Sequence, residues 1–283
     1  MRQNFLCVVS LILAIFSRST RAWSHVGHDV TASIAQAFLQ PHVLSELHNL
    51  TDFSDLSEIS NWADAVKYSH KYSFSRVLHY VNPSDDEPNV CSFRYASDCP
   101  RDRCIVGAIQ NYTRRLDPRS GFSRSQRVDA LKFVVHFVGD VHQPLHVSGR
   151  QKGGNDAPVH FLGKKTKLHA VWDALIIEKR IYDVFQNDID LYVKHLVEMA
   201  ECTFLNIASS PPITEIKKET ERWTNETIKV NCATVWPGYD NSNDGILDDR
   251  YYEDAICVVD NLLAQAGTRL AQTLNRIFDP QKN

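Results

Sequence analysis

Hydrophobic residues recur at helical spacing along most of the chain, and this pattern predicts a mostly α-helical protein. In the first such segment, Val30, Ile34, Ala37 and Phe38 would form one apolar stripe. The pattern predicts helices over residues 24–40, 41–50, 54–69, 104–116, 123–141, 169–180, 188–207, 214–229 and 250–277. Pro41 suits the first turn of its helix, and Ser123 or Ser125 can cap the helix that follows.

The remaining segments predict loops and a small amount of β structure. Residues 77–83 are short, apolar and ended by a proline, so we expect them to be extended. Residues 84–103 and 147–168 read as loops, with a turn at 153–155 and a small hairpin near 159–164. Pro211-Pro212 separates two helices, and no internal repeat or low-complexity linker occurs. The expected fold is therefore a single all-α domain with a small β element.

One apolar segment, residues 133–146, carries histidine and aspartate at helical spacing. His136 and Asp140 are four residues apart and would lie on the same face of a helix. Pro144 would end that helix, and His146 follows just beyond it. A second pair with the same spacing, His169 and Asp173, lies further along the chain.

Buried imidazoles and carboxylates without partners cost several kcal/mol to desolvate, so they need an explanation. One such pair alone is more often a satisfied core histidine or an ion pair within a helix. Two pairs with a histidine between them favour metal coordination. The candidate metal ligands are His28, Asp64, His79, His136, Asp140, His146, His169 and Asp173. This set lacks cysteine, suits hydrolytic zinc and is large enough for two or three ions.

The N-terminus has the proportions of a secretory signal. An arginine precedes an apolar run over residues 5–16, which is too short to cross a membrane. Cleavage after Ala22 would leave residues 23–283 as a secreted protein without a membrane anchor. Loss of residues 1–22 removes three arginines and no acid, which changes the formal net charge from −3 to −6. This charge argues against binding duplex phosphates through a basic face, but not against binding phosphate through metal ions.

Cysteines and glycosylation motifs agree with secretion. Six cysteines remain after cleavage, which allows fifteen ways to form three disulfides, including a small loop between Cys99 and Cys104. The acceptors in glycosylation motifs are Asn49, Asn111 and Asn225.

Taken in order, these motifs resemble the S1/P1 nuclease family of secreted, zinc-dependent single-strand nucleases. The segments that carry the resemblance are Trp23, Trp62-Ala-Asp64, Leu78-His79-Tyr80, His136 to His146, Gly153-Gly-Asn155 and Leu168 to Asp173. The resemblance extends from Trp23 to about Phe278 and implies a single all-α domain with a small β element.

The resemblance implies three zinc ions. Asp64, His79, His136 and Asp140 would bind one, and His146, His169 and Asp173 a second. The third would bind the terminal amine and carbonyl of Trp23, together with His28 and Asp140, so that Asp140 bridges two ions. The resemblance also implies the disulfides Cys91–Cys232 and Cys99–Cys104, which leaves Cys202 and Cys257 as the third pair.

The implied activity is hydrolysis of single-stranded DNA and RNA to 5′-phosphorylated products, with removal of the 3′-phosphate from mononucleotides by a monomeric enzyme. Asp64 and Asp140 would act as catalytic ligands, and Asn155 would bind phosphate near the third zinc. Tyr80 would stack on a base, although a core aromatic is an equally good reading of this residue. Asn82 stands where some relatives have an acid that contacts the base, and Lys67 stands where relatives often have arginine.

Two other functions fit part of the pattern. A zinc phospholipase C resembles this family in its metal site, its helical fold and its N-terminal tryptophan. A secreted binding protein with purely structural metals is the second alternative, but structural zinc sites are usually rich in cysteine.

Overall fold

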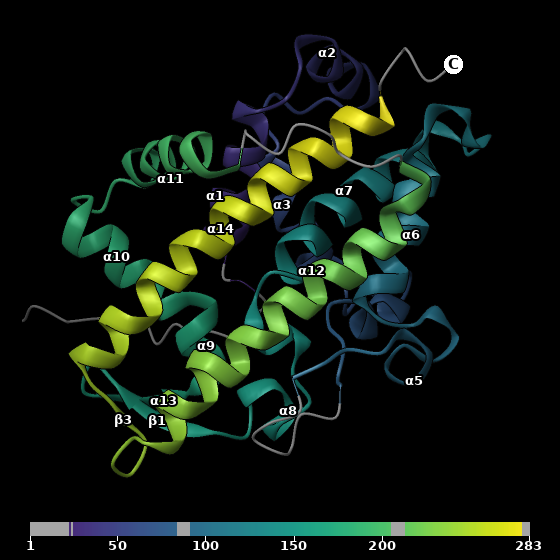
Figure 1. Ribbon diagram of the computed structural model, residues 1–283. Coiled ribbons are helices and arrows are strands. Elements are labelled where there is room, and N and C mark those ends of the chain that lie inside the picture. Colours follow the sequence, from purple (N-terminus) through teal and green to yellow (C-terminus); the bar gives the residue numbers. More distant parts are fainter. Residues whose placement is uncertain (1–22, 24, 84–90, 205–212, 279–283) are drawn as a thin grey trace, which may run out of the picture.

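Helices make up most of the molecule, as expected, and α14 (Asp249–Ile277) runs across its full length (Figure 1). The computed structural model describes residues 23, 25–83, 91–204 and 213–278. The predicted signal segment 1–22 and the Pro211-Pro212 break lie outside these residues. Within them, no helix is both long and apolar enough to cross a membrane. The all-α fold with a small β element is confirmed.

The other elements follow the chain in the order of their numbers. Up to the central helix they are α1 (His25–Ala37), α2 (Pro41–Leu50), α3 (Ser57–Ser60), α4 (Trp62–Val66), η1 (Ser73–Leu78), α5 (Tyr95–Asp98), η2 (Pro100–Asp102), α6 (Ile105–Leu116), η3 (Pro118–Ser120) and α7 (Arg124–Asp140). After it come η4 (Pro144–Val147), α8 (Gln151–Gly154), β1 (Pro158–Phe161), β2 (Lys164–Lys167), α9 (Leu168–Ala170), η5 (Val171–Leu175), α10 (Ile176–Val184), α11 (Ile189–Phe204), η6 (Ile213–Glu215), α12 (Ile216–Val230), η7 (Asn231–Val235), α13 (Trp236–Asp240) and β3 (Ile246–Leu247).

The central helix α7 begins with a capping box and ends inside the protein. The Ser123 hydroxyl accepts a hydrogen bond from the Gln126 amide, and the Gln126 side chain accepts one from the Ser123 amide. From Ala130 onwards nearly every side chain is buried, so this half of the helix is apolar except at the partly exposed Lys132 and at His136 and Asp140.

Close packing joins α14 to α1. A Cβ atom at Gly267 would lie 2.4 Å from Cγ2 of Ile34, so only glycine allows this approach of the two helices. In Figure 1, α14 passes in front of α1, and α7 is seen between α14 and α12.

The small sheet lies at one end of the molecule and has the strand order β2-β1-β3. Strands β1 and β2 pair antiparallel, with Val159 opposite Thr166, and this is the predicted hairpin. Strand β3 pairs with β1 in parallel. The hydrophobic pattern does not predict β3, α13 or the π-helical turn η7, because each is short and weakly patterned.

Two hydrophobic clusters form the core, and the predicted ligands lie where they meet. Residues of α7 such as Phe133 and Phe137 belong to one cluster. Leu145, Leu168 and Trp172 belong to the other. The polar side chains of His136 and Asp140 are therefore enclosed by apolar surface from both sides.

Three predicted elements differ from the structure. The single helix over 54–69 was wrong, because α3 and α4 are separated at Asn61, whose side chain donates to Asp29. The extended segment at 77–83 was wrong at its start, which is the end of the 3-10 helix η1. The helix from His169 to Arg180 exists, but it includes the π-helical turn η5 and continues to Val184.

Two disulfides occur, Cys91–Cys232 and Cys99–Cys104, as the family resemblance implied. The third predicted pair was wrong. Cys202 on α11 and Cys257 on α14 are both unpaired and exposed, so pairing the last two cysteines does not describe this protein.

Candidate metal centre

The end of α7 brings the two predicted clusters of ligands together. His136 and Asp140 lie one turn apart and are completely buried. The chain then turns at Pro144 into η4, which places His146 on the other side of Asp140, with its Nδ1 atom 3.5 Å from Oδ1 of the aspartate.

The first cluster contains Asp64 from α4, His79, His136 and Asp140. Nδ1 of His79 lies 3.0 Å from Oδ2 of Asp140 and 3.4 Å from Oδ1 of Asp64. Nε2 of His136 lies 3.2 Å from Oδ2 of Asp140 and 3.5 Å from Oδ1 of Asp64. Two imidazoles and two carboxylates therefore point at one small volume.

The second cluster contains His146, His169 and Asp173. Nε2 of His169 is 3.0 Å from Oδ2 of Asp173, and Nε2 of His146 is 3.7 Å from Oδ1 of the same carboxylate. The side chains of His169 and Asp173 still meet, although a π-helical turn begins between the two residues.

The third cluster contains His28, His136 and Asp140. Nε2 of His28 lies 3.3 Å from Oδ1 of Asp140, whereas Oδ2 of that carboxylate faces His79 and His136. The two oxygens of Asp140 thus serve two different clusters.

Trp23 is fully buried beside the third cluster. Its indole Nε1 donates a hydrogen bond of 2.9 Å to the carbonyl oxygen of Gly139, the residue before Asp140. Its ring also packs on Gly27, where a Cβ atom would lie 3.0 Å from the indole. These contacts hold the predicted first residue of the mature chain next to His28 and Asp140.

Backbone carbonyl groups orient three of the imidazoles. Nδ1 of His136 donates to the carbonyl oxygen of Ser60 (2.7 Å). Nδ1 of His146 donates to the carbonyl oxygen of His79 (2.8 Å), and Nδ1 of His169 donates to that of Gly153 (2.6 Å). Each bond fixes the tautomer in which Nε2 carries a free lone pair and faces its cluster. His79 is the exception, since its Nδ1 atom faces the carboxylates.

A glutamine that the sequence analysis missed holds the second carboxylate. Gln143 is fully buried, and its amide nitrogen donates to Oδ1 of Asp173. Its amide oxygen accepts from the backbone nitrogen of Leu145. No spacing rule marks such a residue, because a single glutamine next to Pro144 resembles any helix terminus.

Burial and charge prepare these groups to bind a cation. Burial lowers the pKa of His28 and of His79 to about 4, so both are neutral at ordinary pH. Burial also acts to lower the pKa of His136, but the Asp140 and Asp64 carboxylates outweigh it and raise that pKa to about 10. The two acids therefore demand positive charge at this position, from a proton or from a metal ion.

The polar atoms without partners fit metal ligation. Within the described residues, the buried atoms that have no hydrogen-bond partner include both ring nitrogens of His28, Nε2 of His79, Nε2 of His146, Oδ1 of Asp140 and Oδ2 of Asp173. Leaving buried polar atoms unsatisfied is costly, and coordination to cations would satisfy those that face the clusters, namely Nε2 of His28, Nε2 of His146, Oδ1 of Asp140 and Oδ2 of Asp173.

A pocket of about 460 Å³ opens over the first two clusters. His79, His146 and His169 line its floor, and the predicted substrate-binding residues Lys67, Tyr80, Asn82 and Asn155 line its walls. Tyr80 is 38% exposed, so it is not a core aromatic. Lys67 Nζ lies 2.6 Å from Oδ1 of Asp64, and the Asn155 amide donates to the carbonyl oxygen of Lys152 (3.1 Å).

Other histidines, among them His25, His70, His142 and His160, do not belong to the three clusters. His25, His70 and His160 are exposed. His142 is buried behind the site, where its ring bonds to the carbonyl oxygen of Val138 and to the Arg269 guanidinium. The pocket also contains Tyr68, Arg76 and Lys152, which the sequence analysis missed.

Comparison with known proteins finds relatives over nearly the whole chain. The family model for S1/P1 nuclease matches residues 23–279. Endonuclease 2 of Arabidopsis thaliana is 35% identical, over 98% of this chain and 99% of its own length. Nuclease S1 of Aspergillus oryzae is 32% identical over 95% and 96% of the two chains, and nuclease P1 of Penicillium citrinum is 31% identical over 90% and 97%. The chain belongs to the S1/P1 nuclease family.

Proposed function

We propose that this nuclease is a secreted, zinc-dependent endonuclease that cleaves single-stranded DNA and RNA and leaves 5′-phosphates. The observation that carries the proposal is the set of three buried His/Asp clusters, two of which contribute residues to a pocket that is also lined by cationic and aromatic side chains. We also propose that it removes the 3′-phosphate of mononucleotides, because hydrolysis of this phosphate monoester breaks the same bond, between phosphorus and the 3′ oxygen, as cleavage of the diester.

The donor set favours zinc, because it combines neutral imidazoles with carboxylates and contains no cysteine. Asp64, His79, His136 and Asp140 would hold the first ion. His146, His169 and Asp173 would hold the second. Trp23, His28 and Asp140 would hold the third once residues 1–22 are removed, because Trp23 then has a free α-amino group.

The ions would supply Lewis acidity and a water molecule of lowered pKa. The chain's own groups determine where that chemistry acts. Asp64 and Asp140 would orient the reacting water, while the amide of Asn155 and the ammonium of Lys67, which contacts Asp64, would bind phosphate oxygens. Lys67 offers a point charge rather than the planar fork of an arginine.

The aromatic wall supports a preference for single strands. A base must leave its stack to lie on the ring of Tyr80, which is feasible in a single strand and costly in a duplex. Asn82 lines the same wall and would contact the base edge through its amide.

Digestion by the mature protein tests the proposal directly. Single-stranded DNA and RNA are incubated with protein that has been treated with a chelator, and zinc is then added back. We expect cleavage to stop after chelation and to resume when zinc is added, with 5′-phosphate ends on the products. Absence of cleavage by zinc-loaded protein over pH 4–9 would refute the nuclease activity, and hydrolysis of phosphatidylcholine vesicles in its place would support the phospholipase alternative.

Secretion carries its own test. Expression of the full chain in a secreting eukaryotic host should yield a protein that begins at Trp23 and carries glycans on Asn49, Asn111 and Asn225. The N-terminal sequence and the mass before and after glycosidase treatment measure both points, and size-exclusion chromatography tests the proposed monomer.

A further inference from the structure

The hairpin of strands β1 and β2 carries at its tip a leucine whose backbone conformation is unfavourable. The pairing of Phe161 with Lys164 leaves Leu162 and Gly163 as the turn between the strands. Both turn residues have positive φ, 52° and 71°, which is the type I′ geometry that asparagine and glycine usually provide. A bulky side chain is a true outlier there, and such outliers often mark a functional segment.

The same leucine is exposed. Leu162 is 53% exposed, and a Cβ atom at Gly163 would meet nothing within 4 Å, so the tip projects into open space. Ile246 of β3 is also 53% exposed and pairs with His160 of β1. Because paired residues point to the same side of a sheet, Ile246 and His160 share the outward face. The tip and this face therefore present two large aliphatic side chains to the solvent.

Strand β2, at the edge of the sheet, adds three lysines. Lys164, Lys165 and Lys167 are all exposed. None of them forms an ion pair in the part of the chain that the structure describes, whereas the nearby Lys152 pairs with Asp156 (2.6 Å). The three ammonium groups are therefore available to an anionic partner.

This cationic edge contrasts with the rest of the protein. Residues 158–167 contain no acid, although the chain as a whole has a negative formal net charge. The strand order β2-β1-β3 places the loop that leads into β3, with Asp244, at the opposite edge of the sheet. Asp248, on the same side, caps α14 by accepting a hydrogen bond from the Tyr251 amide.

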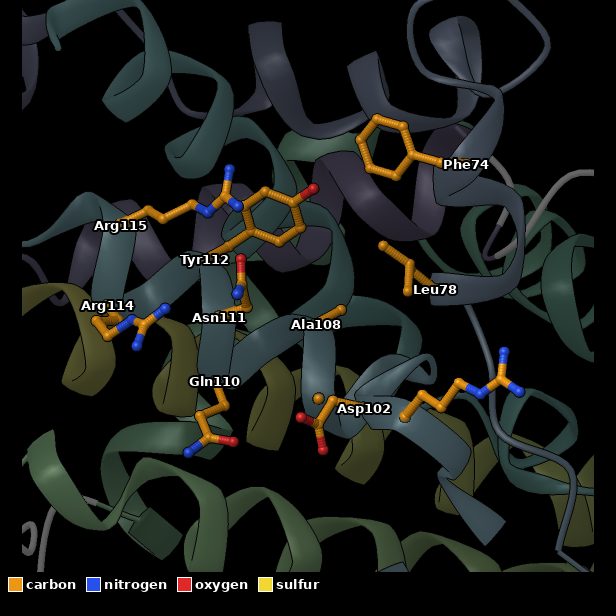
Figure 2. A pocket seen from close by; sticks show the side chains of 11 residues that line it. Phe74, Leu78, Asp102, Ala108, Gln110, Asn111, Tyr112, Arg114 and Arg115 are labelled. Atoms are coloured by element: carbon orange, nitrogen blue, oxygen red, sulfur yellow. The ribbon is translucent and has the colours of Figure 1, made fainter. Parts of the chain in front are cut away.

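Two simpler explanations fit only part of this surface. Lysines on an edge strand discourage pairing with another chain, but an exposed leucine at the tip has the opposite effect. A single strand would need a ring to stack on, and residues 158–167 and 246–247 offer no exposed tyrosine, tryptophan or phenylalanine. In the pocket between η1 and α6, by contrast, Figure 2 shows Arg114 and Arg115 together with the ring of Phe74.

We propose that the hairpin tip and the outward face of the sheet dock on a bilayer that contains anionic phospholipids. Leu162 and Ile246 enter the boundary between headgroups and acyl chains, and the lysines bind the anionic headgroups. The protein binds peripherally and reversibly, since two side chains and three charges give modest affinity. Lys167 is two residues before His169, which lines the metal pocket, so docking holds that pocket close to the membrane surface.

Co-sedimentation with lipid vesicles measures this docking on the mature, zinc-loaded protein. The native protein should sediment with vesicles that contain one third phosphatidylserine, and it should stay in solution with vesicles of phosphatidylcholine alone. Added salt should release it, because salt screens the attraction between lysines and headgroups. Native protein that ignores the anionic vesicles would overturn the proposal. Vesicle binding requires no turnover, so the result does not depend on the proposed nuclease activity.

The variant Leu162→Asn separates docking from folding. Asparagine suits the first position of a type I′ turn, so this variant should melt at the same temperature as the native protein or higher. It should nevertheless bind the anionic vesicles about 5-fold more weakly, the loss expected when a half-buried leucine side chain is removed. Lys164→Gln/Lys165→Gln should weaken binding by about 25-fold, or about 5-fold for each lysine.

Matched controls remove the same groups elsewhere on the surface. Lys194→Gln/Lys229→Gln deletes two exposed lysines, one on α11 and one on α12, and changes the net charge by the same amount. Leu191→Asn replaces a leucine that is 45% exposed on α11. Both controls should bind like the native protein, and an equal loss in the two lysine double variants would overturn the proposal.

A separate outcome distinguishes lipid from soluble polyanions. If Lys164→Gln/Lys165→Gln lost binding while Leu162→Asn bound like the native protein, charge alone would explain the attraction. The surface would then be one for acidic polymers in solution, and docking on a bilayer would be refuted.

Discussion

At the scale of the residue, the site depends on groups that never face the pocket. The carbonyl groups of Ser60, His79 and Gly153 each fix one imidazole, and Gln143 fixes the Asp173 carboxylate. Outer partners of this kind are typically worth 10- to 100-fold in metal affinity. The sequence predicted the imidazoles and carboxylates through their i, i+4 spacing, but backbone carbonyl groups carry no sequence signal.

Replacement of Gln143 by methionine should therefore weaken zinc binding at the second cluster. Methionine keeps the volume but removes both hydrogen bonds, so Asp173 loses its orientation. We expect about a 10- to 100-fold loss of affinity for one zinc ion, measured as bound zinc after dialysis against a metal buffer. Asp129→Asn, on the exposed half of α7, provides the control. Three ions retained by the methionine variant at limiting zinc would show that Gln143 does not position this ligand.

The zinc-free protein should have a bell-shaped dependence of stability on pH. In the folded protein the pKa of His28 and of His79 is about 4, which is below the unfolded value of 6.5. Their contribution to the free energy of unfolding is therefore present above pH 6.5 and is lost as the pH falls towards 4. The folded pKa of His136, about 10, lies above its unfolded value, so its contribution is lost as the pH rises towards 10. Thermal melting from pH 4 to 10 measures both limbs, and zinc should flatten the alkaline limb by replacing the proton on His136. A flat profile for zinc-free protein contradicts this account.

At the scale of the element, local sequence signals predicted the well-capped helices. They failed where contacts with other parts of the fold determine the local conformation. Helices α2, α6 and α7 matched because proline, an apolar stripe or a capping serine marked them. The break at Asn61 depends on Asp29 in a different helix, and the π-helical turn η5 depends on packing around Trp172. The segment around Tyr80 looked like a strand, but its backbone bonds to Ile105 and its neighbour Val81 bonds to His146.

That irregular segment exposes Tyr80 at the pocket wall, and its substitution tests the stacking role. Tyr80→Ala should raise KM for single-stranded oligonucleotides by about 5- to 150-fold, since stacking contributes about 1–3 kcal/mol per base. Tyr80→Phe should retain most of the affinity. Tyr182, 70% exposed on α10, is a control tyrosine outside the pocket. If Tyr80→Ala and Tyr182→Ala gave the same KM, stacking on Tyr80 would have to be abandoned.

At the scale of the whole molecule, Trp23 and α1, from the early part of the chain, and the C-terminal helix α14 lie around one site. Trp23 bonds to Gly139 in the centre of the fold, and α14 packs across both α1 and α7. The family model spans 23–279, which is the part of the chain that contains all the predicted ligands.

Two residues added before Trp23 should therefore disable the third zinc site. The added peptide bond removes the free amine, whereas the indole contact to Gly139 need not change. We expect one fewer zinc ion per chain and at least a 10-fold lower kcat, measured by elemental analysis and oligonucleotide cleavage. The same two residues placed after Asn283 form the control. Full zinc content and normal kcat in the N-terminally extended protein would rule out a ligand role for Trp23.

The predicted ligands come from α1, α4, the segment after η1, α7, η4 and the α9–η5 junction, which are distant in sequence. Cations bound by these ligands would act as crosslinks between segments that, within the described residues, no disulfide joins to one another. Zinc supply would then set the lifetime of the molecule as well as its rate of turnover. The half-life of the protein in a broad-specificity protease should fall severalfold when zinc is removed, and an enzyme released into a zinc-poor medium would be destroyed soon after it stopped working.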